Sequence, residues 1–120
     1  MNEVAEKGFG FYAGGVVIGS VGVLKKGDSQ LKIGGICKLA VDPIFRRNGV
    51  ASELMKVADT YLKLNSFHLG ALWKGHGVTP GFYEGFGYSS LNGSDIMVME
   101  LEGTRDSGSI MEAIRKEGVW

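Results

Sequence analysis

The stretch DPIFRRNGVASELM, residues 42–55, marks the point where the chain changes from one periodicity to another. Ahead of it, residues 31–42 have the pattern of a β-strand that Pro43 ends. Behind it, apolar residues recur at helical spacing, which predicts an amphipathic helix from Gly49 to Leu64. A strand, a loop, a helix and a further strand in this order indicate a crossover between parallel strands.

The predicted helix has one apolar and one charged face. The apolar stripe, which we expect to pack on the core, consists of Leu54, Val57, Ala58 and Tyr61. The charged side, which we expect to face water, consists of Glu53, Lys56, Asp59 and Lys63.

Strands and turns are predicted on both sides of this unit. Residues 9–24 predict two strands joined by a turn at Gly14-Gly15, the second running from Val16 to about Lys25. Thr79 as N-cap and Pro80 at the first helical position predict a short helix through Tyr83 and Glu84. The other predicted elements are strands at 67–73, 87–91 and 95–102 and a C-terminal helix at 109–118.

These elements predict an α+β fold, with a mixed sheet that carries helices on its faces. Its middle strands are expected to be parallel and its flanking hairpins antiparallel. A chain of 120 residues is long enough for one domain, which we assign to residues 1–120. Its core covers residues 9–102, and residues 103–120 form a tail.

The composition indicates which partners and which cellular compartment to expect. With 13 basic and 13 acidic side chains, the formal net charge is zero, so no nucleic-acid or membrane partner is expected from global charge. The single cysteine, Cys37, allows no internal disulfide, and we expect it to be buried and inert on its strand. No apolar run has transmembrane length, and the N-terminus lacks a signal core. We therefore expect a cytoplasmic protein.

The loop between the predicted strand and helix has the properties of an anion-binding site. Arg46 and Arg47 lie in it, and Gly49 stands at the helix entrance, where the first backbone N–H groups have no internal partners. Glycine lets a ligand approach the backbone, and the small residues Ala51 and Ser52 leave the first turn uncluttered. These properties suit a phosphate or pyrophosphate. The alternative interpretation is an ordinary helix start with two solvated arginines.

Three motifs resemble one known family. RRNGVA, residues 46–51, resembles the R/Q-x-x-G-x-G/A signature of the GNAT superfamily of N-acetyltransferases, with Ala51 in the last place. The apolar stretch CKLAVDP, residues 37–43, stands ahead of it, and GFYEGFGY, residues 81–88, resembles the family's FY-x-x-x-GF element. The motifs agree with the family in order and spacing, and the resemblance covers roughly residues 9–102.

The resemblance implies a mixed, mainly antiparallel GNAT-like sheet whose parallel pair splays apart between KLAV, residues 38–41, and HLGALW, residues 68–73. The family usually has a strand and two helices before the first hairpin. Only MNEVAEKG, residues 1–8, stands there, so we expect these elements to be absent. The acceptor site is then expected to be open or completed by a second subunit. A free sheet edge favours association, so we expect a homodimer.

The resemblance also implies acetyl-CoA as co-substrate, with no metal. In the family, the backbone amides of the signature loop bind the pyrophosphate, and the preceding strand holds the pantetheine arm through its main chain. The strand residues carried over are Leu39, Ala40 and Val41, and the loop residues are Arg46, Arg47, Asn48, Gly49, Val50 and Ala51, with Ser52 behind them.

The implied reaction is direct transfer of an acetyl group to a primary amine of a small molecule. Tyr83 matches the family's tyrosine that protonates the departing thiolate, although a core aromatic is the alternative. A backbone N–H near Val41 is expected to hold the carbonyl oxygen. No general base is evident, since the positions that match the family's glutamate hold Gly34 and Gly35. His76 is a base, an acceptor-site residue or merely a solvated side chain.

A more specific likeness concerns the acceptor. HLGAL, FYEGFGY and the ending IRKEGVW resemble aminoglycoside 2'-N-acetyltransferases. By that resemblance, Glu117 and the terminal carboxylate of Trp120 would bind a cationic drug. The alternative is a tail whose tryptophan packs on the body. Two other hypotheses stay open: a CoA-binding or dimeric interaction module with reduced catalysis, and an unrelated α+β protein. We expect His68 to be structural.

Overall fold

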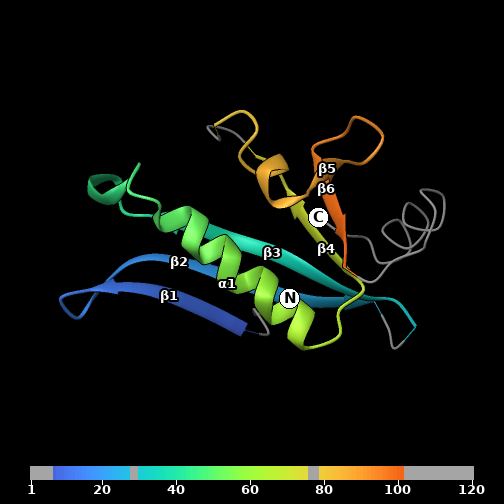
Figure 1. The fold of residues 1–120 in the computed structure, drawn as a ribbon, viewed down its shortest axis with the longest axis horizontal. Helices are drawn as coiled ribbons and strands as arrows, with labels where there is room; N and C mark the ends of the chain where they lie inside the picture. Colours follow the sequence, from blue (N-terminus) through green and yellow to red (C-terminus); the bar gives the residue numbers. More distant parts are fainter. Residues whose placement is uncertain (1–6, 28–29, 76–78, 102–120) are drawn as a thin grey trace, which may run out of the picture.

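The computed structural model describes residues 7–27, 30–75 and 79–101, and these form one mixed sheet with a helix across it (Figure 1). The strand order is β1-β2-β3-β4-β6-β5, with β3 and β4 parallel and all other neighbours antiparallel. The mixed α+β fold with a central parallel pair is thereby confirmed. The elements are β1 Lys7–Ala13, β2 Val16–Gly27, β3 Lys32–Val41, α1 Val50–Leu64, β4 Leu69–Trp73, β5 Ser89–Ser90 and β6 Ile96–Glu100, with 3-10 helices at Pro43–Phe45 and Glu84–Phe86.

The first hairpin and the main helix follow the sequence closely. The turn between β1 and β2 falls at Gly14-Gly15 as predicted, and both glycines have positive φ. The helix begins at Val50 with Gly49 as its N-cap and ends at Leu64. Among the described residues, no helix is long and apolar enough to span a membrane.

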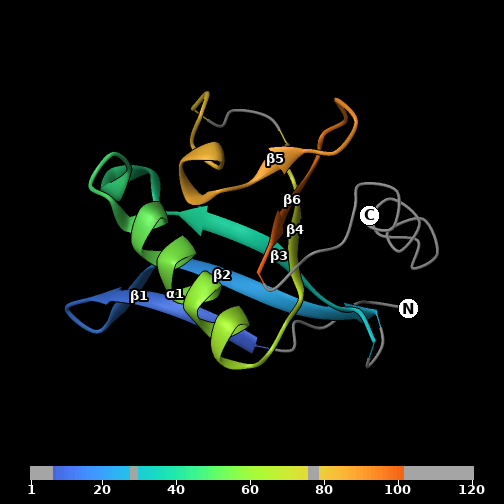
Figure 2. The ribbon, with the colours of Figure 1, turned by 45° about the vertical axis from the view of Figure 1, so that its right-hand side comes forward.

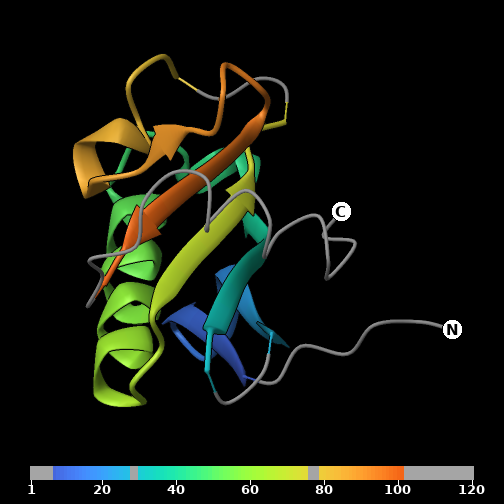
Figure 3. The same ribbon diagram turned by 90° about the vertical axis from the view of Figure 1, so that its right-hand side faces the viewer.

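Helix α1 lies on one face of the sheet, and the segment that contains Tyr83 covers the same face beside it (Figures 2 and 3). Two glycines let the helix layer come close. A Cβ on Gly34 would overlap Leu62 of α1, and a Cβ on Gly70 would lie 2.7 Å from the Tyr88 hydroxyl oxygen. The same crowding leaves no room for a side chain at Gly34 of β3.

Buried apolar side chains form two clusters. Because successive strand residues point to opposite faces, Ile33, Leu69 and Ala71 lie on the face of the sheet that is turned away from α1. The larger cluster joins α1, the strands beneath it and the segment around Tyr83 and Tyr88. Its buried members are Ile18, Val21, Val23, Ile36, Val50, Leu54, Met55, Ala58, Leu62, Phe67, Leu72, Tyr83, Tyr88 and Met97.

The buried face of α1 differs from the expected stripe. Leu54 and Ala58 are buried as predicted, but Val57 is 43% exposed and Tyr61 is only half-buried. Asp59, expected to face water, is buried. The buried face of α1 is therefore rotated about the helix axis relative to the expected stripe. Its members are Val50, Leu54, Met55, Ala58, Asp59 and Leu62.

The short helix expected from Pro80 is also different. Residues 80–83 form a turn, and a 3-10 helix follows only at Glu84–Phe86. Gly81 and Gly87 have φ of +82° and +97°, and these left-handed residues prevent a continuous α-helix on either side. The last hairpin is present, but β5 is only two residues long. The C-terminal helix expected at 109–118 lies outside the described residues.

The parallel pair separates toward its carboxyl ends. The ladder between β3 and β4 runs from Ile33 opposite Leu69 to Ile36 opposite Leu72, and β3 then continues to Val41 without β4 beside it. Pairing with β2 changes register here, which places two residues of β3 opposite one of β2 and forms a β-bulge. Lys38, in this bulge, has a φ of +54°. The splayed pair that the resemblance implies is thus present (Figure 1).

Candidate functional site

The loop that leaves β3 is held by its own side chains. Asp42 Oδ1 accepts a hydrogen bond of 3.0 Å from the Ile44 N–H and caps the first 3-10 helix. Asn48 Nδ2 donates to the Phe45 and Arg46 carbonyls at 3.2 and 3.3 Å. Because Asn48 closes the loop on itself, the chain reaches the helix start in a fixed conformation.

The entrance to α1 is made by left-handed backbone. Arg47 and Gly49 have φ of +68° and +79°, and Gly49 is the N-cap with no side-chain cap bond among the described residues. A Cβ on Gly49 would meet nothing within 4 Å, so the space above it is open. The first N–H groups of α1 have no partner within the helix, and the dipole adds partial positive charge there. This arrangement can receive an anion.

The start of α1 packs against β2. Val50 is buried, and its Cγ1 would lie 2.8 Å from a Cβ on Gly19 of β2, so the glycine makes room for it. The residues assigned to the signature loop therefore lie together around one helix start. Arg46, Arg47, Asn48 and Gly49 are exposed, Ala51 and Ser52 are half-buried, and Val50 is buried.

The end of β3 has a paired side and an unpaired side. Ala40 and Val41 pair with Ser20 and Gly19 of β2, whereas the ladder with β4 has already ended at Ile36. Leu39 and Val41 are half-buried and Ala40 is exposed. The Arg46 Nε–H donates to the Val41 carbonyl at 3.3 Å, which ties the loop to the strand end.

Tyr83 belongs to the segment between β4 and β5, and this segment lies beyond the carboxyl end of β4 (Figures 1 and 2). Its side chain is 8% exposed, and its ring meets that of Phe82 edge-on at a centroid distance of 5.1 Å. Burial raises the pKa of the Tyr83 phenol above its ordinary value of 10.0. The phenol therefore keeps its proton at neutral pH and can serve as an acid.

A buried polar pair lies beside Tyr83, and sequence reasoning missed it. The Tyr88 hydroxyl donates a hydrogen bond of 3.1 Å to Oδ1 of Asp59 on α1. Burial raises the pKa of Asp59, while the Tyr88 bond and the charge of Lys63 act against this. Burial, Asp59 and Tyr83 together raise the pKa of Tyr88. The burial of Asp59 had one signal in the sequence, its spacing: Asp59 falls four residues after Met55, and the two share one face of the helix.

The remaining candidates separate into two groups. His68 is structural as expected, because its Nδ1 accepts from the Lys32 backbone N–H at 2.8 Å and its backbone N–H donates to the Lys32 carbonyl at 2.8 Å. Cys37 is half-buried rather than buried. The candidates His76, Glu117 and Trp120 lie outside the described residues.

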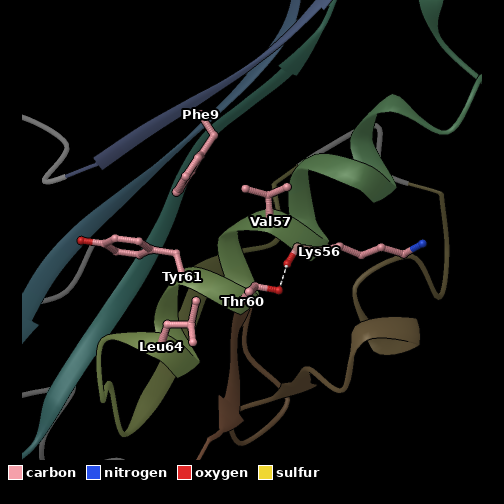
Figure 4. A pocket seen from close by; sticks show the side chains of 6 residues that line it. All are labelled: Phe9, Lys56, Val57, Thr60, Tyr61 and Leu64. Carbon is pink, nitrogen blue, oxygen red and sulfur yellow. Dashed lines mark hydrogen bonds between the residues drawn. The ribbon is translucent and has the colours of Figure 1, made fainter.

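One apolar groove of about 330 Å³ lies on the outer side of α1, facing β1 (Figure 4). The signature loop and Tyr83 do not contribute to it, so it is not part of the candidate site. Thr60 Oγ1 donates to the Lys56 carbonyl at 2.8 Å along its wall. Its lining consists of Phe9, Lys56, Val57, Thr60, Tyr61 and Leu64.

A family model for the acetyltransferase (GNAT) domain matches residues 4–90. The chain therefore belongs to the GNAT family, as the motifs implied. No curated protein sequence matches it. Within the described residues, no group of three or more His, Cys, Asp or Glu side chains could hold a metal ion.

Solved structures share this fold. A GNAT family N-acetyltransferase from Escherichia coli in complex with CoA is 25% identical, with a TM-score of 0.60 over 72% of this chain and 53% of that one. A GNAT family acetyltransferase from Brucella melitensis in complex with acetyl-CoA is 14% identical, with a TM-score of 0.67 over 82% and 60%. An aminoglycoside acetyltransferase from an uncultured soil metagenomic sample is 15% identical, with a TM-score of 0.54 over 59% and 48%. The chain thus spans about half the length of these relatives.

Proposed function

We propose that the protein is an acetyl-CoA-dependent N-acetyltransferase that acts on a primary amine of a small molecule by direct transfer. The observation that carries the proposal is the open, left-handed entrance to α1 at Gly49, which follows the part of β3 that continues beyond its ladder with β4. The pyrophosphate would bind the N–H groups of residues 49–52, with Arg46 and Arg47 near its outer oxygens. The pantetheine arm would follow Leu39, Ala40 and Val41.

The reaction is then a single acyl transfer. The neutral amine nitrogen forms a bond to the thioester carbon, the carbon–sulfur bond breaks, and the bonding pair leaves with sulfur. Tyr83 gives its proton to the thiolate, and the amine loses a proton to solvent or to a base. The raised pKa of Tyr83 keeps this acid protonated at neutral pH.

Calorimetric titration with acetyl-CoA tests the cofactor site. Gly49→Trp is expected to abolish saturable binding, because its side chain fills the space above the helix start. Gly93→Trp is a matched control: its φ is +72° and a Cβ there would also meet nothing within 4 Å, so it carries the same backbone strain in another turn. Equal loss in both variants, or no binding by folded wild type, would contradict the proposal.

The alternative is a CoA-binding or dimeric interaction module with reduced catalysis. It is supported by the glycines at Gly34 and Gly35, which leave β3 without a carboxylate base. Acetyl transfer to a panel of amines separates the two proposals. A panel that includes aminoglycosides also tests the acceptor for which His76, Glu117 and Trp120 are the candidate binding residues.

The proposal extends to assembly and location. Strand β1 has β2 as its neighbour on one side and forms an edge of the described sheet, which favours a homodimer. Light scattering at two protein concentrations tests this. The neutral net charge and single cysteine support a cytoplasmic location without a nucleic-acid or membrane partner.

A further inference from the structure

Asp59 and Tyr88 form a polar pair inside the apolar layer between α1 and the sheet. Asp59 is 8% exposed and Tyr88 is 2% exposed, and the Tyr88 hydroxyl donates to Asp59 Oδ1 at 3.1 Å. Aspartate is seldom buried without a partner, because removing a carboxylate from water is costly. Phenylalanine at position 88 and an apolar residue at position 59 would avoid that cost. The pair therefore calls for an explanation other than stability.

The pair connects two parts of the proposed active site. Asp59 is on α1, whose first turn is the proposed pyrophosphate site, and Tyr88 ends the segment that carries Tyr83. Backbone bonds make this segment a tight unit: the Tyr83 carbonyl accepts from the Phe86 N–H at 3.0 Å and from the Tyr88 N–H at 3.3 Å. A displacement of Tyr88 is therefore passed directly to Tyr83.

The Tyr88 hydroxyl is closely surrounded by β4 and α1. Its hydroxyl lies over Gly70 of β4, where a Cβ would come within 2.7 Å of the oxygen. Leu62 of α1 fills the neighbouring space, with its Cδ1 3.3 Å from the same Cβ position. A hydrogen bond is directional, so Asp59 fixes the ring in this space, whereas apolar packing alone would permit sliding.

We propose that Asp59 and Tyr88 are positioning residues that hold the Tyr83 phenol in place relative to the start of α1. This inference rests on the proposed function, in which Tyr83 protonates the leaving thiolate. Neither residue touches the reacting atoms. They act by fixing the segment between β4 and β5 against the helix that would bind the cofactor.

Tyrosine-specific NMR provides the test. The chain has four tyrosines, so protein labelled with ¹³C at the tyrosine Cζ gives four signals, which single Tyr→Phe variants assign. In Tyr88→Phe and Asp59→Leu, we expect the Tyr83 signal to move and its titration midpoint to fall by about half a pH unit or more, as the phenol becomes more exposed. Asp59→Asn keeps an acceptor oxygen at Oδ1, so the position and titration midpoint of the Tyr83 signal should be the same in this variant as in the wild type. The signal of Tyr12, which is exposed, is an internal control.

Addition of acetyl-CoA separates the two proposals. If acetyl-CoA leaves the wild-type Tyr83 signal unchanged, the proposed function fails. If the wild type responds and Tyr88→Phe still binds acetyl-CoA by calorimetry with at least twofold less movement of the Tyr83 signal, the positioning role is supported. An unchanged Tyr83 signal, midpoint and response in folded Tyr88→Phe would overturn it. Should Asp59→Leu not fold, Tyr88→Phe, which removes one oxygen atom, carries the test.

Discussion

Gly70 of β4 and Tyr88 fit each other closely: a Cβ on Gly70 would lie 2.7 Å from the Tyr88 hydroxyl oxygen. The oxygen would be the nearest atom, since Leu62 Cδ1 and Tyr88 Cε2 would lie 3.3 and 3.4 Å away, which is tight but less severe. The absence of a side chain on β4 is therefore matched to the hydroxyl that binds Asp59.

Gly70→Ala should lower the free energy of unfolding by about 1–3 kcal/mol through overpacking. Much of this loss should disappear in a Tyr88→Phe background, because the atom that would clash is then missing. Urea denaturation of the two single variants and the double variant measures the coupling. Gly8→Ala is the control, because a Cβ on Gly8 of β1 would meet nothing within 4 Å. Additive losses at Gly70 and Tyr88 would contradict the fit.

Asp59 should make stability depend on pH in an unusual direction. Its folded-state pKa is raised above the ordinary value of 3.8, so the folded protein binds the proton more tightly than the unfolded chain does. The contribution of Asp59 is therefore most favourable below pH 3.8 and falls as pH rises through the folded pKa. Asp59→Asn removes this dependence. The stability of the variant relative to wild type should therefore rise from pH 3 to pH 7, and urea denaturation in that range measures it. A constant difference would show that the carboxyl titrates as it does in the unfolded chain.

The buried face of α1 gives a test of the corrected packing. Met55 is fully buried, so Met55→Ala should cost about 2–5 kcal/mol. Val57 is 43% exposed, and Val57→Ala should cost less than about 1 kcal/mol. Thermal unfolding followed by circular dichroism compares the stability of the two variants. A larger loss in Val57→Ala than in Met55→Ala would support the apolar stripe expected from the sequence instead.

The contrast between Met55 and Val57 shows where sequence reasoning ends. Both residues fit helical spacing, and only the shape of the opposing surface decides which one is buried. Gly49 and the helix start were predictable because capping and backbone signals are local. The contact between Tyr88 and Asp59 joins residues 29 positions apart, and no local pattern specifies it.

Tyr83→Phe should slow acetyl transfer and leave acetyl-CoA affinity nearly unchanged, because the ring stays and only the acidic proton is lost. Loss of a general acid typically reduces kcat about 10²–10⁴-fold. Since burial raises the Tyr83 pKa above 10.0, the wild-type rate should decline on the alkaline side only above the pH of an ordinary phenol. A pH–rate profile with a matched calorimetric titration checks both points. An equal fall in affinity and rate would instead assign Tyr83 to the core alone.

Arg47 should separate stability from cofactor affinity. Its φ of +68° is in the left-handed region, which is unfavourable for arginine and tolerated by asparagine. Arg47→Asn should therefore raise the free energy of unfolding, by about 0.5 kcal/mol, as measured by urea denaturation. The same change removes a cation beside the helix start. If Arg47 contacts a phosphate, the loss of about 1 kcal/mol should weaken acetyl-CoA binding about fivefold. Lys38→Asn is the matched control, since Lys38 also has a positive φ, of 54°, but lies in the β3 bulge. Higher stability without weaker binding in Arg47→Asn would make Arg47 a solvated side chain.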